Sequence, residues 1–226
     1  MTSPFRPAWG AVADAAGVAD GASLLDLGCG DGGFCAFAAS RGAIVHGVDA
    51  EPDAIAAALE AAPAGDFRLG MMESLPWADD SLDVVTAFNA VQYALDPDLA
   101  LVEAARVVRP DGRIAVCKWG PPAGNEFFAF LAAIGAGGVS GEVDSVPDPV
   151  ENAIRTTRLA VVSTGEVAAP IEMADDGALE ASLSRAGIEA FHPATSVTGA
   201  AAKYRGADGA YRFDNWLRYW VLRRGR

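Results

Sequence analysis

The sequence predicts an α/β fold, a doubly wound and mostly parallel sheet with helices on both faces. Between residues 22 and 119, short apolar stretches alternate with stretches of helical periodicity. Such alternation forms βαβ units, whose right-handed crossovers place helices on both sides of a parallel sheet. A glycine-rich stretch, LLDLGCGDGG at 24–33, begins in the first apolar run. Ligands of these sheets bind at the carboxyl ends of the strands, where this loop falls.

The first half of the chain supplies five strands, which are short and apolar or β-branched and end at glycine or turn residues. They are expected at 22–28, 43–49, 66–72, 81–90 and 113–119. Helices are expected between them at 31–42, 51–62 and 97–108, and RPDG at 109–112 is a turn sequence. Residues 5–17 predict a further helix, within an N-terminal helix or lid over 1–20.

The alternation of strand and helix patterns ends after Trp119. Residues 120–174 show no clear strand and predict a helical cap insertion, with helices near 125–135 and 150–158. Long insertions in α/β enzymes often carry function, although an ordinary helical excursion is the alternative. A helix at 175–188, a strand at 188–195, a loop at 196–209 and a strand at 210–224 complete one domain over 1–226, whose last strands form a hairpin with one antiparallel strand.

Composition argues against several classes of protein. The formal net charge of −13 lacks the basic footprint of nucleic-acid binders. Three cysteines without a C-x-x-C pair indicate neither a disulfide framework nor a metal site. No apolar run reaches the ~18 residues of a membrane span, and the N-terminus lacks a signal pattern. These features favour a cytoplasmic protein with a small-molecule substrate.

The glycine loop raises the question of which ligand it holds. Gly28, Gly30 and Gly33 satisfy the dinucleotide pattern G-x-G-x-x-G. Asp26 and Asp31, however, would each repel a pyrophosphate, by up to about 4 kcal/mol at ~4 Å and an effective dielectric near 20. S-adenosylmethionine carries an ammonium and a sulfonium and no phosphate. The two carboxylates therefore favour S-adenosylmethionine over a nicotinamide dinucleotide.

Several ordered motifs between residues 22 and 119 carry a resemblance to a known family. LLDLGCGDGG contains the D-x-G-x-G-x-G pattern, and HGVDAEPDAIAAA, FRLGMMESLPWADDSLDVVTAFNAVQYALDP and ARVVRPDGRIAVCKW follow it. This series resembles the class I S-adenosylmethionine-dependent methyltransferases, especially the small-molecule enzymes of ubiquinone and menaquinone biosynthesis. The resemblance implies a seven-stranded sheet of order 3-2-1-4-5-7-6, with strand seven (210–224) antiparallel.

The resemblance also implies a set of cofactor-binding residues. Asp26 would face the ammonium, Asp49 would bind the ribose, Met72 would meet the adenine, and Asn89 would reach the methionine amine. The full set is Asp26, Gly28, Cys29, Gly30, Asp49, Ala50, Met72, Glu73 and Asn89. The chain departs from the family at Met71, where an Asp usually binds the adenine amino group. Glu73 or a water molecule is the expected substitute.

The implied reaction is in-line methyl transfer to a small molecule, for which the protein supplies position and electrostatics. Tyr93 and His192 are the candidate catalytic residues, with packing and surface exposure as the respective alternatives. Phe127, Phe128 and Phe130 suggest an apolar or aromatic acceptor, although a core-facing helix would look the same. Two other hypotheses remain: a cofactor-binding protein that does not methylate, and, less favoured, an NAD-dependent oxidoreductase.

Overall fold

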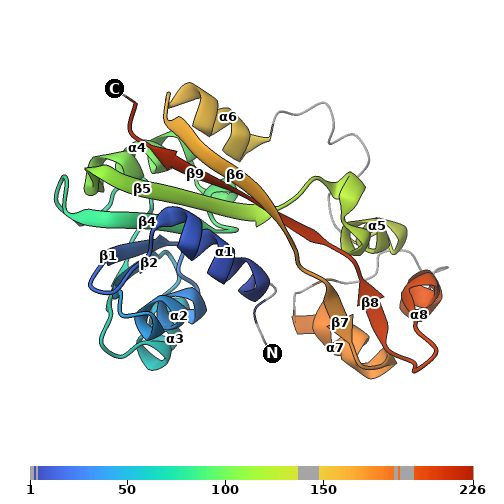
Figure 1. The fold of residues 1–226 in the computed structure, drawn as a ribbon. Coiled ribbons are helices and arrows are strands. Elements are labelled where there is room, and N and C mark those ends of the chain that lie inside the picture. Colours follow the sequence, from blue (N-terminus) through green and yellow to red (C-terminus); the bar gives the residue numbers. More distant parts are fainter. Residues whose placement is uncertain (1–2, 4, 137–147, 186–187, 189–195, 226) are drawn as a thin grey trace. The chain divides into compact units, whose positions relative to one another are not determined.

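The computed structural model describes residues 3, 5–136, 148–185, 188 and 196–225, which form two compact units (Figure 1). Unit 1 comprises Met1–Lys118, Pro147–Val167 and Leu217–Arg226, and unit 2 comprises Trp119–Val146 and Ala168–Trp216. The chain thus leaves unit 1 and returns to it twice. The expectation of one domain with a cap over 120–174 remains a prediction, because that segment is divided between the units.

A seven-stranded sheet forms the centre of unit 1, in the order β3-β2-β1-β4-β5-β9-β6. Its strands are β1 (Ser23–Leu27), β2 (Ile44–Asp49), β3 (Asp66–Leu69), β4 (Leu82–Phe88), β5 (Val108–Trp119), β6 (Ala160–Ala168) and β9 (Trp216–Arg223). The arrowheads of β5 and β9 point in opposite directions in Figure 1, whereas β1 to β5 are parallel. The predicted order is confirmed, with β9 in the antiparallel position.

Helices cover both faces of this sheet. On one face α2 (Gly33–Ser40) contacts both α1 (Arg6–Ala16) and α3 (Pro52–Ala61), and on the other α4 (Pro97–Val107) contacts α6 (Pro149–Thr156) (Figure 1). The last two start at acidic caps: Asp96 accepts a hydrogen bond from Leu99 N, and Asp148 from Val150 N and Glu151 N. No helix in the described part of the chain is long and apolar enough to cross a membrane.

Unit 2 has its own apolar core. Its elements are α5 (Glu126–Ala133), β7 (Ile171–Met173), α7 (Asp176–Arg185), α8 (Val197–Ala201) and β8 (Tyr211–Phe213), and β7 pairs with β8 in antiparallel register. Phe130 and Phe213 are fully buried, with ring centroids 5.2 Å apart. Phe127 and Phe128 are half-buried, and Phe127 packs against both of these rings. At least Phe130 of the three phenylalanines is therefore core.

Several predicted elements differ from those observed in the second half of the chain. The edge strand β6 lies inside the segment expected to lack strands. The strand expected at 210–224 is broken into β8 and β9, and β8 pairs with β7. Of 188–195, only Ile188 is among the described residues, and it is not in a strand. The expected loop at 196–209 contains α8.

The predicted turn at 109–112 is a bulge within β5. Leu82 of β4 pairs with Val108, and Val84 pairs with Arg113, so the four residues between Val108 and Arg113 lie opposite a single residue of β4.

The aromatic residues of β9 differ in how deeply they are buried. Trp220 is buried, Tyr219 is half-buried beside Gly165 of β6, and Trp216 is 47% exposed. Only Trp220 therefore fully meets the expectation of a core residue.

Candidate cofactor-binding site

A pocket of about 250 Å³ lies in unit 1, at the carboxyl ends of four neighbouring parallel strands. The loops after β1, β2, β3 and β4 each contribute to it, as expected for an open α/β sheet. Its lining residues are Gly28, Val48, Asp49, Ala50, Gly70, Met71, Met72, Glu73, Asn89, Ala90, Tyr93 and Ala94. Two larger hollows, of about 760 and 660 Å³, lie away from the glycine loop, so the smaller pocket is the candidate site.

The glycine loop requires glycine for steric reasons at its first position. Gly28 has φ of 62°, and a Cβ there would lie 2.6 Å from Cβ of Ala90. That distance is far inside van der Waals contact, and an L side chain rarely adopts this φ. The absence of a side chain lets the loop after β1 approach the segment after β4, and these two segments border the pocket together.

Asp49, at the end of β2, holds the loop from the side. Its Oδ2 accepts a hydrogen bond from Gly30 N at 2.9 Å, and its Oδ1 accepts one from Glu51 N at 3.0 Å. The carboxylate is half-buried and lines the pocket. Each carboxylate oxygen has two lone pairs, so both retain acceptor capacity for a ligand.

Asp26, by contrast, does not line the pocket. It is 2% exposed in β1, between Gly47 and Thr86 of the neighbouring strands, and its Oδ1 accepts a hydrogen bond from Thr86 Oγ1 at 2.7 Å. Burial raises the pKa of the Asp26 carboxyl to about 7; the Thr86 hydrogen bond lowers it in part, and the nearby charge of Asp49 raises it. Thr86 was not predicted as a site residue, although a polar residue within VVTAF was a visible signal.

Two further residues of the predicted set serve the loop through their backbones. Cys29 N donates to Val48 O at 3.0 Å, and the buried Cys29 side chain lies beside Gly47. Burial raises the pKa of the Cys29 thiol well above its usual range, so the thiol stays protonated. The N–H of Gly30 donates a hydrogen bond to the Asp49 carboxylate. Neither Cys29 nor Gly30 borders the pocket.

The loop after β3 supplies the opposite wall. Met72 is half-buried against the core, whereas Met71 is 42% exposed. Glu73 Oε1 accepts from Asp96 N at 3.2 Å, and its Oε2 is buried without a hydrogen-bond partner among the described residues. A buried carboxylate oxygen without a partner is costly, so a ligand donor at this position would be stabilising.

The segment after β4 closes the pocket. Asn89 has φ of 53° and donates its N–H to Cys117 O at 2.7 Å, and its Oδ1 accepts from Gln92 Nε2 at 2.7 Å. Tyr93 is 74% exposed at the rim and is therefore not a packing residue. His192, the other candidate catalytic residue, lies outside the described residues.

The chain is similar in sequence to known proteins over the segment that contains this pocket. Residues 25–116 match the family Methyltransf_11, a methyltransferase domain. Nocamycin O-methyltransferase of Saccharothrix syringae is 42% identical over 128 residues, which are 52% of this chain and 45% of the relative. Ubiquinone biosynthesis O-methyltransferase of Brucella anthropi is 38% identical over 101 residues, 43% of this chain and 41% of the relative. The chain thus spans less than half the length of these curated relatives.

Solved structures share the fold over nearly the whole chain. The [4+2]-cyclase SpnF matches with a TM-score of 0.62 and 18% identity, covering 96% of this chain and 80% of that one. Geranyl diphosphate C-methyltransferase of Streptomyces coelicolor matches with a TM-score of 0.58 and 18% identity, covering 96% and 78%. Residues 25–116 thus match a methyltransferase domain, and the strand order of the sheet is that of a Rossmann-like methyltransferase fold.

Proposed function

We propose that the chain binds S-adenosylmethionine in the 250 Å³ pocket and catalyses transfer of the methyl group to a small molecule. The observation that carries this proposal is the pocket itself, where the glycine loop, Asp49, Met72, Glu73 and Asn89 converge. The homologous segment of the curated O-methyltransferases supports the same activity. When bound, the cofactor supplies a methyl group activated by a positively charged sulfur.

The residues present fit this cofactor at several points. The carboxylate of Asp49 keeps free lone pairs, which suit the two hydroxyls of a ribose. The partnerless Oε2 of Glu73 suits the amino group of an adenine, in place of the Asp that the family usually has at position 71. Met72 would pack on the base, and Asn89 would meet the methionine amine. Asp26 would act from beneath the loop through its charge, because Thr86 holds it away from the pocket.

For the acceptor, we propose a small apolar or aromatic molecule. Exposed side chains at the rim, Tyr93 at 74% and Met71 at 42%, offer apolar surface beside the pocket. The net charge of −13 disfavours a polyanionic substrate such as a nucleic acid. Tyr93 would orient the acceptor hydroxyl or remove its proton as the hydroxyl oxygen attacks the methyl carbon. His192 would be the second candidate for that proton.

The first test is calorimetry with S-adenosylhomocysteine and, in parallel, NADH. We expect S-adenosylhomocysteine to bind and NADH not to bind. Asp49→Asn should weaken the binding by about tenfold or more, since hydrogen bonds to a charged group contribute about 1.5–3 kcal/mol. Glu60→Gln, on the exposed surface of α3, is the matched control and should leave the affinity unchanged. Tight NADH binding with no response to S-adenosylhomocysteine would refute the cofactor assignment.

Glu73→Gln extends the test to recognition of the adenine ring. We expect this variant to bind S-adenosylhomocysteine more weakly, but to keep its affinity for the analogue in which a 6-oxo group replaces the adenine amino group. The alternative function, cofactor binding without methylation, is favoured by one observation: the [4+2]-cyclase SpnF has the same fold. Release of S-adenosylhomocysteine from S-adenosylmethionine in the presence of candidate phenols and acids would exclude this alternative.

A further inference from the structure

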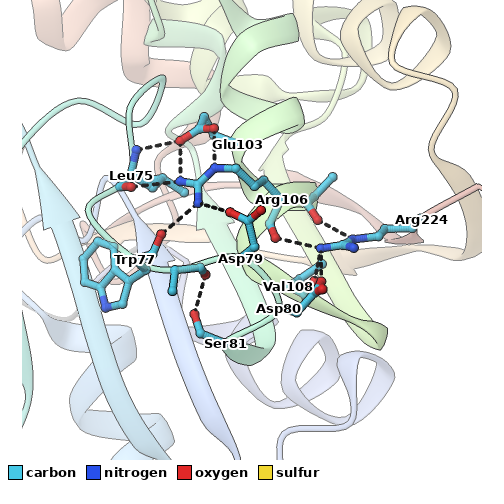
Figure 2. Close-up of polar contacts among 11 residues, drawn as sticks. Leu75, Trp77, Asp79, Asp80, Ser81, Glu103, Arg106, Val108 and Arg224 are labelled. Atoms are coloured by element: carbon cyan, nitrogen blue, oxygen red, sulfur yellow. Dashed lines mark hydrogen bonds and ion pairs between the residues drawn. The ribbon is translucent and has the colours of Figure 1, made fainter.

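Arg106, in the last turn of α4, points at the loop that joins β3 to β4 (Figure 2). Every N–H group of its guanidinium has a partner, and two of the five bonds go to main-chain oxygens of that loop. The acceptors are Glu103 Oε1 at 2.7 Å, Glu103 Oε2 at 2.7 Å, Trp77 O at 2.8 Å, Asp79 Oδ1 at 2.8 Å and Leu75 O at 2.9 Å. A planar guanidinium with all donors used has one orientation.

Glu103 completes the connection from the same face of α4. Its Oε2 also accepts from Leu75 N at 2.8 Å, so both the N–H and the C=O of Leu75 are bonded to side chains of α4. The Glu103 side chain is 15% exposed, and the hydrogen bond from Arg106 lowers its pKa. Glu103 is therefore ionised at neutral pH, and these bonds are charge-assisted.

The same loop forms one wall of the pocket. Gly70, Met71, Met72 and Glu73 line it directly before Leu75, and Glu73 accepts a hydrogen bond from Asp96 N at the start of α4. The segment that leads into α4 contributes Ala90, Tyr93 and Ala94 to the facing wall. Helix α4 is thus bonded to the β3–β4 loop at both of its ends and is continuous with the facing wall.

We propose that Arg106 and Glu103 are positioning residues for cofactor binding, which hold the β3–β4 loop at the spacing that the adenine end requires. This inference rests on the proposed function. A loop without these bonds must be ordered when the ligand binds, and the cost of ordering reduces affinity. Arg106 and Glu103 remove that cost by ordering the loop in advance, without touching the ligand.

Figure 2 also provides a matched control. Arg224 reaches the same region and donates to Ala105 O, Arg106 O and Val108 O, and it pairs with Asp80 at 2.6 Å. None of these partners lines the pocket or lies between Gly70 and Trp77. Arg224→Gln therefore removes a comparable set of bonds from the fold while leaving the pocket wall attached.

The test compares Arg106→Gln, Glu103→Gln and Arg224→Gln in the full chain. Hydrogen exchange over residues 70–77 is measured without ligand, and S-adenosylhomocysteine affinity is measured by calorimetry. We expect Arg106→Gln to accelerate exchange at Leu75 and its neighbours and to raise the Kd about tenfold or more, as several charge-assisted bonds are lost. Glu103→Gln should be intermediate, and Arg224→Gln should change neither quantity beyond twofold. Once a methyl acceptor is identified, Arg106→Gln should raise KM for S-adenosylmethionine while kcat stays within about twofold of the wild-type value.

The inference is overturned if Arg106→Gln and Arg224→Gln behave alike at equal stability. Arg106→Lys, which keeps the charge and part of the bonding, replaces Arg106→Gln if the latter does not fold, and should then be the intermediate variant. Failure of the proposed function has a separate signature, because the wild-type chain would then not bind S-adenosylhomocysteine at all. The exchange data on the ligand-free chain would still decide whether the pair holds the loop.

Discussion

At the scale of single residues, Asp26 is a carboxyl group almost completely removed from water. It is 2% exposed, has one neutral hydrogen-bond donor, and has a pKa raised to about 7. Near neutral pH a large fraction of the ligand-free protein therefore carries a neutral Asp26. A cation bound above it would favour the ionised form, so binding of the positively charged cofactor should release protons around pH 7.

The same carboxyl makes stability depend on pH. Its pKa is higher in the folded chain than the ordinary value of 3.8, so folding takes up protons between pH 4 and 7. Its stabilising contribution is complete below about pH 4 and is lost as the pH rises through 7. At ~1.4 kcal/mol per pKa unit, the change is at most about 4 kcal/mol.

Asp26→Asn should remove this dependence. Urea unfolding of both proteins at pH 5, 6, 7 and 8 would measure it, and the wild-type chain should lose more stability toward pH 8 than the variant. Thr86→Val removes the hydrogen bond that lowers the pKa of Asp26. In this variant the loss of stability should therefore occur at a higher pH than in the wild-type chain. Equal slopes for wild type and Asp26→Asn would contradict the assignment of this pKa.

At the scale of elements, the approach of α2 to α3 depends on Gly32. This residue caps α2 with φ of 73°, and a Cβ would lie 2.7 Å from Cα of Ala58 in α3. The obstacle is backbone rather than a flexible side chain, so the helix itself would have to move. Gly32→Ala combines an unfavourable φ with a steric clash, each of which costs about 1 kcal/mol or more.

We therefore expect Gly32→Ala to lower the free energy of unfolding by about 2–4 kcal/mol in urea titration. Gly10→Ala is the contrasting substitution, since Gly10 lies within α1 and, apart from its own helix backbone and chain neighbours, no described atom lies within 4 Å of its added Cβ. That change should be neutral or stabilising, by up to about 1 kcal/mol. A destabilised Gly10→Ala, or a neutral Gly32→Ala, would contradict the argument.

The elements also show why some of the fold was predictable and some was not. The strands β1 and β4 are largely buried on both faces, so their apolar runs are visible in the sequence. The edge strand β6, AVVSTGEVA, has no fully buried residue and hence no hydrophobic period that would reveal it. The break between β8 and β9 falls at the buried Asn215, whose Oδ1 accepts a hydrogen bond from Phe127 N, 88 residues away in the chain, and a partner so distant leaves no local signal.

The candidate site follows the same rule. Gly28, Asp49, Ala50, Met72, Glu73, Asn89 and Tyr93 line the pocket and were all identified from motifs at the ends of strands. Arg106 and Glu103 were not, because in the sequence they are an ordinary i, i+3 charge pair on a helix. Their role depends on the path of a loop some 30 residues away in the chain, which local patterns do not encode.

At the scale of the whole molecule, two apolar clusters among the described residues, one in each unit, share no residue. The core of unit 1 surrounds β1, β4 and β5, and that of unit 2 surrounds Phe130, Tyr211 and Phe213. All residues that line the cofactor pocket belong to unit 1. Damage to the core of unit 2 should therefore leave cofactor binding intact, even where it abolishes turnover.

Phe213→Ala tests this separation. Phe213 is fully buried and contacts the rings of Phe127, Phe130 and Tyr204, so truncation should destabilise unit 2 by about 3–5 kcal/mol. Hydrogen exchange should rise in the described parts of unit 2 but not in β1, β4 or β5, and the Kd for S-adenosylhomocysteine should stay within about twofold. Phe213→Leu is the milder variant, and Leu82→Ala, in the core of unit 1, is the control that should weaken binding. If Phe213→Ala raised exchange in both units and weakened binding as Leu82→Ala does, the two cores would unfold as one cooperative body, and the pocket would depend on both.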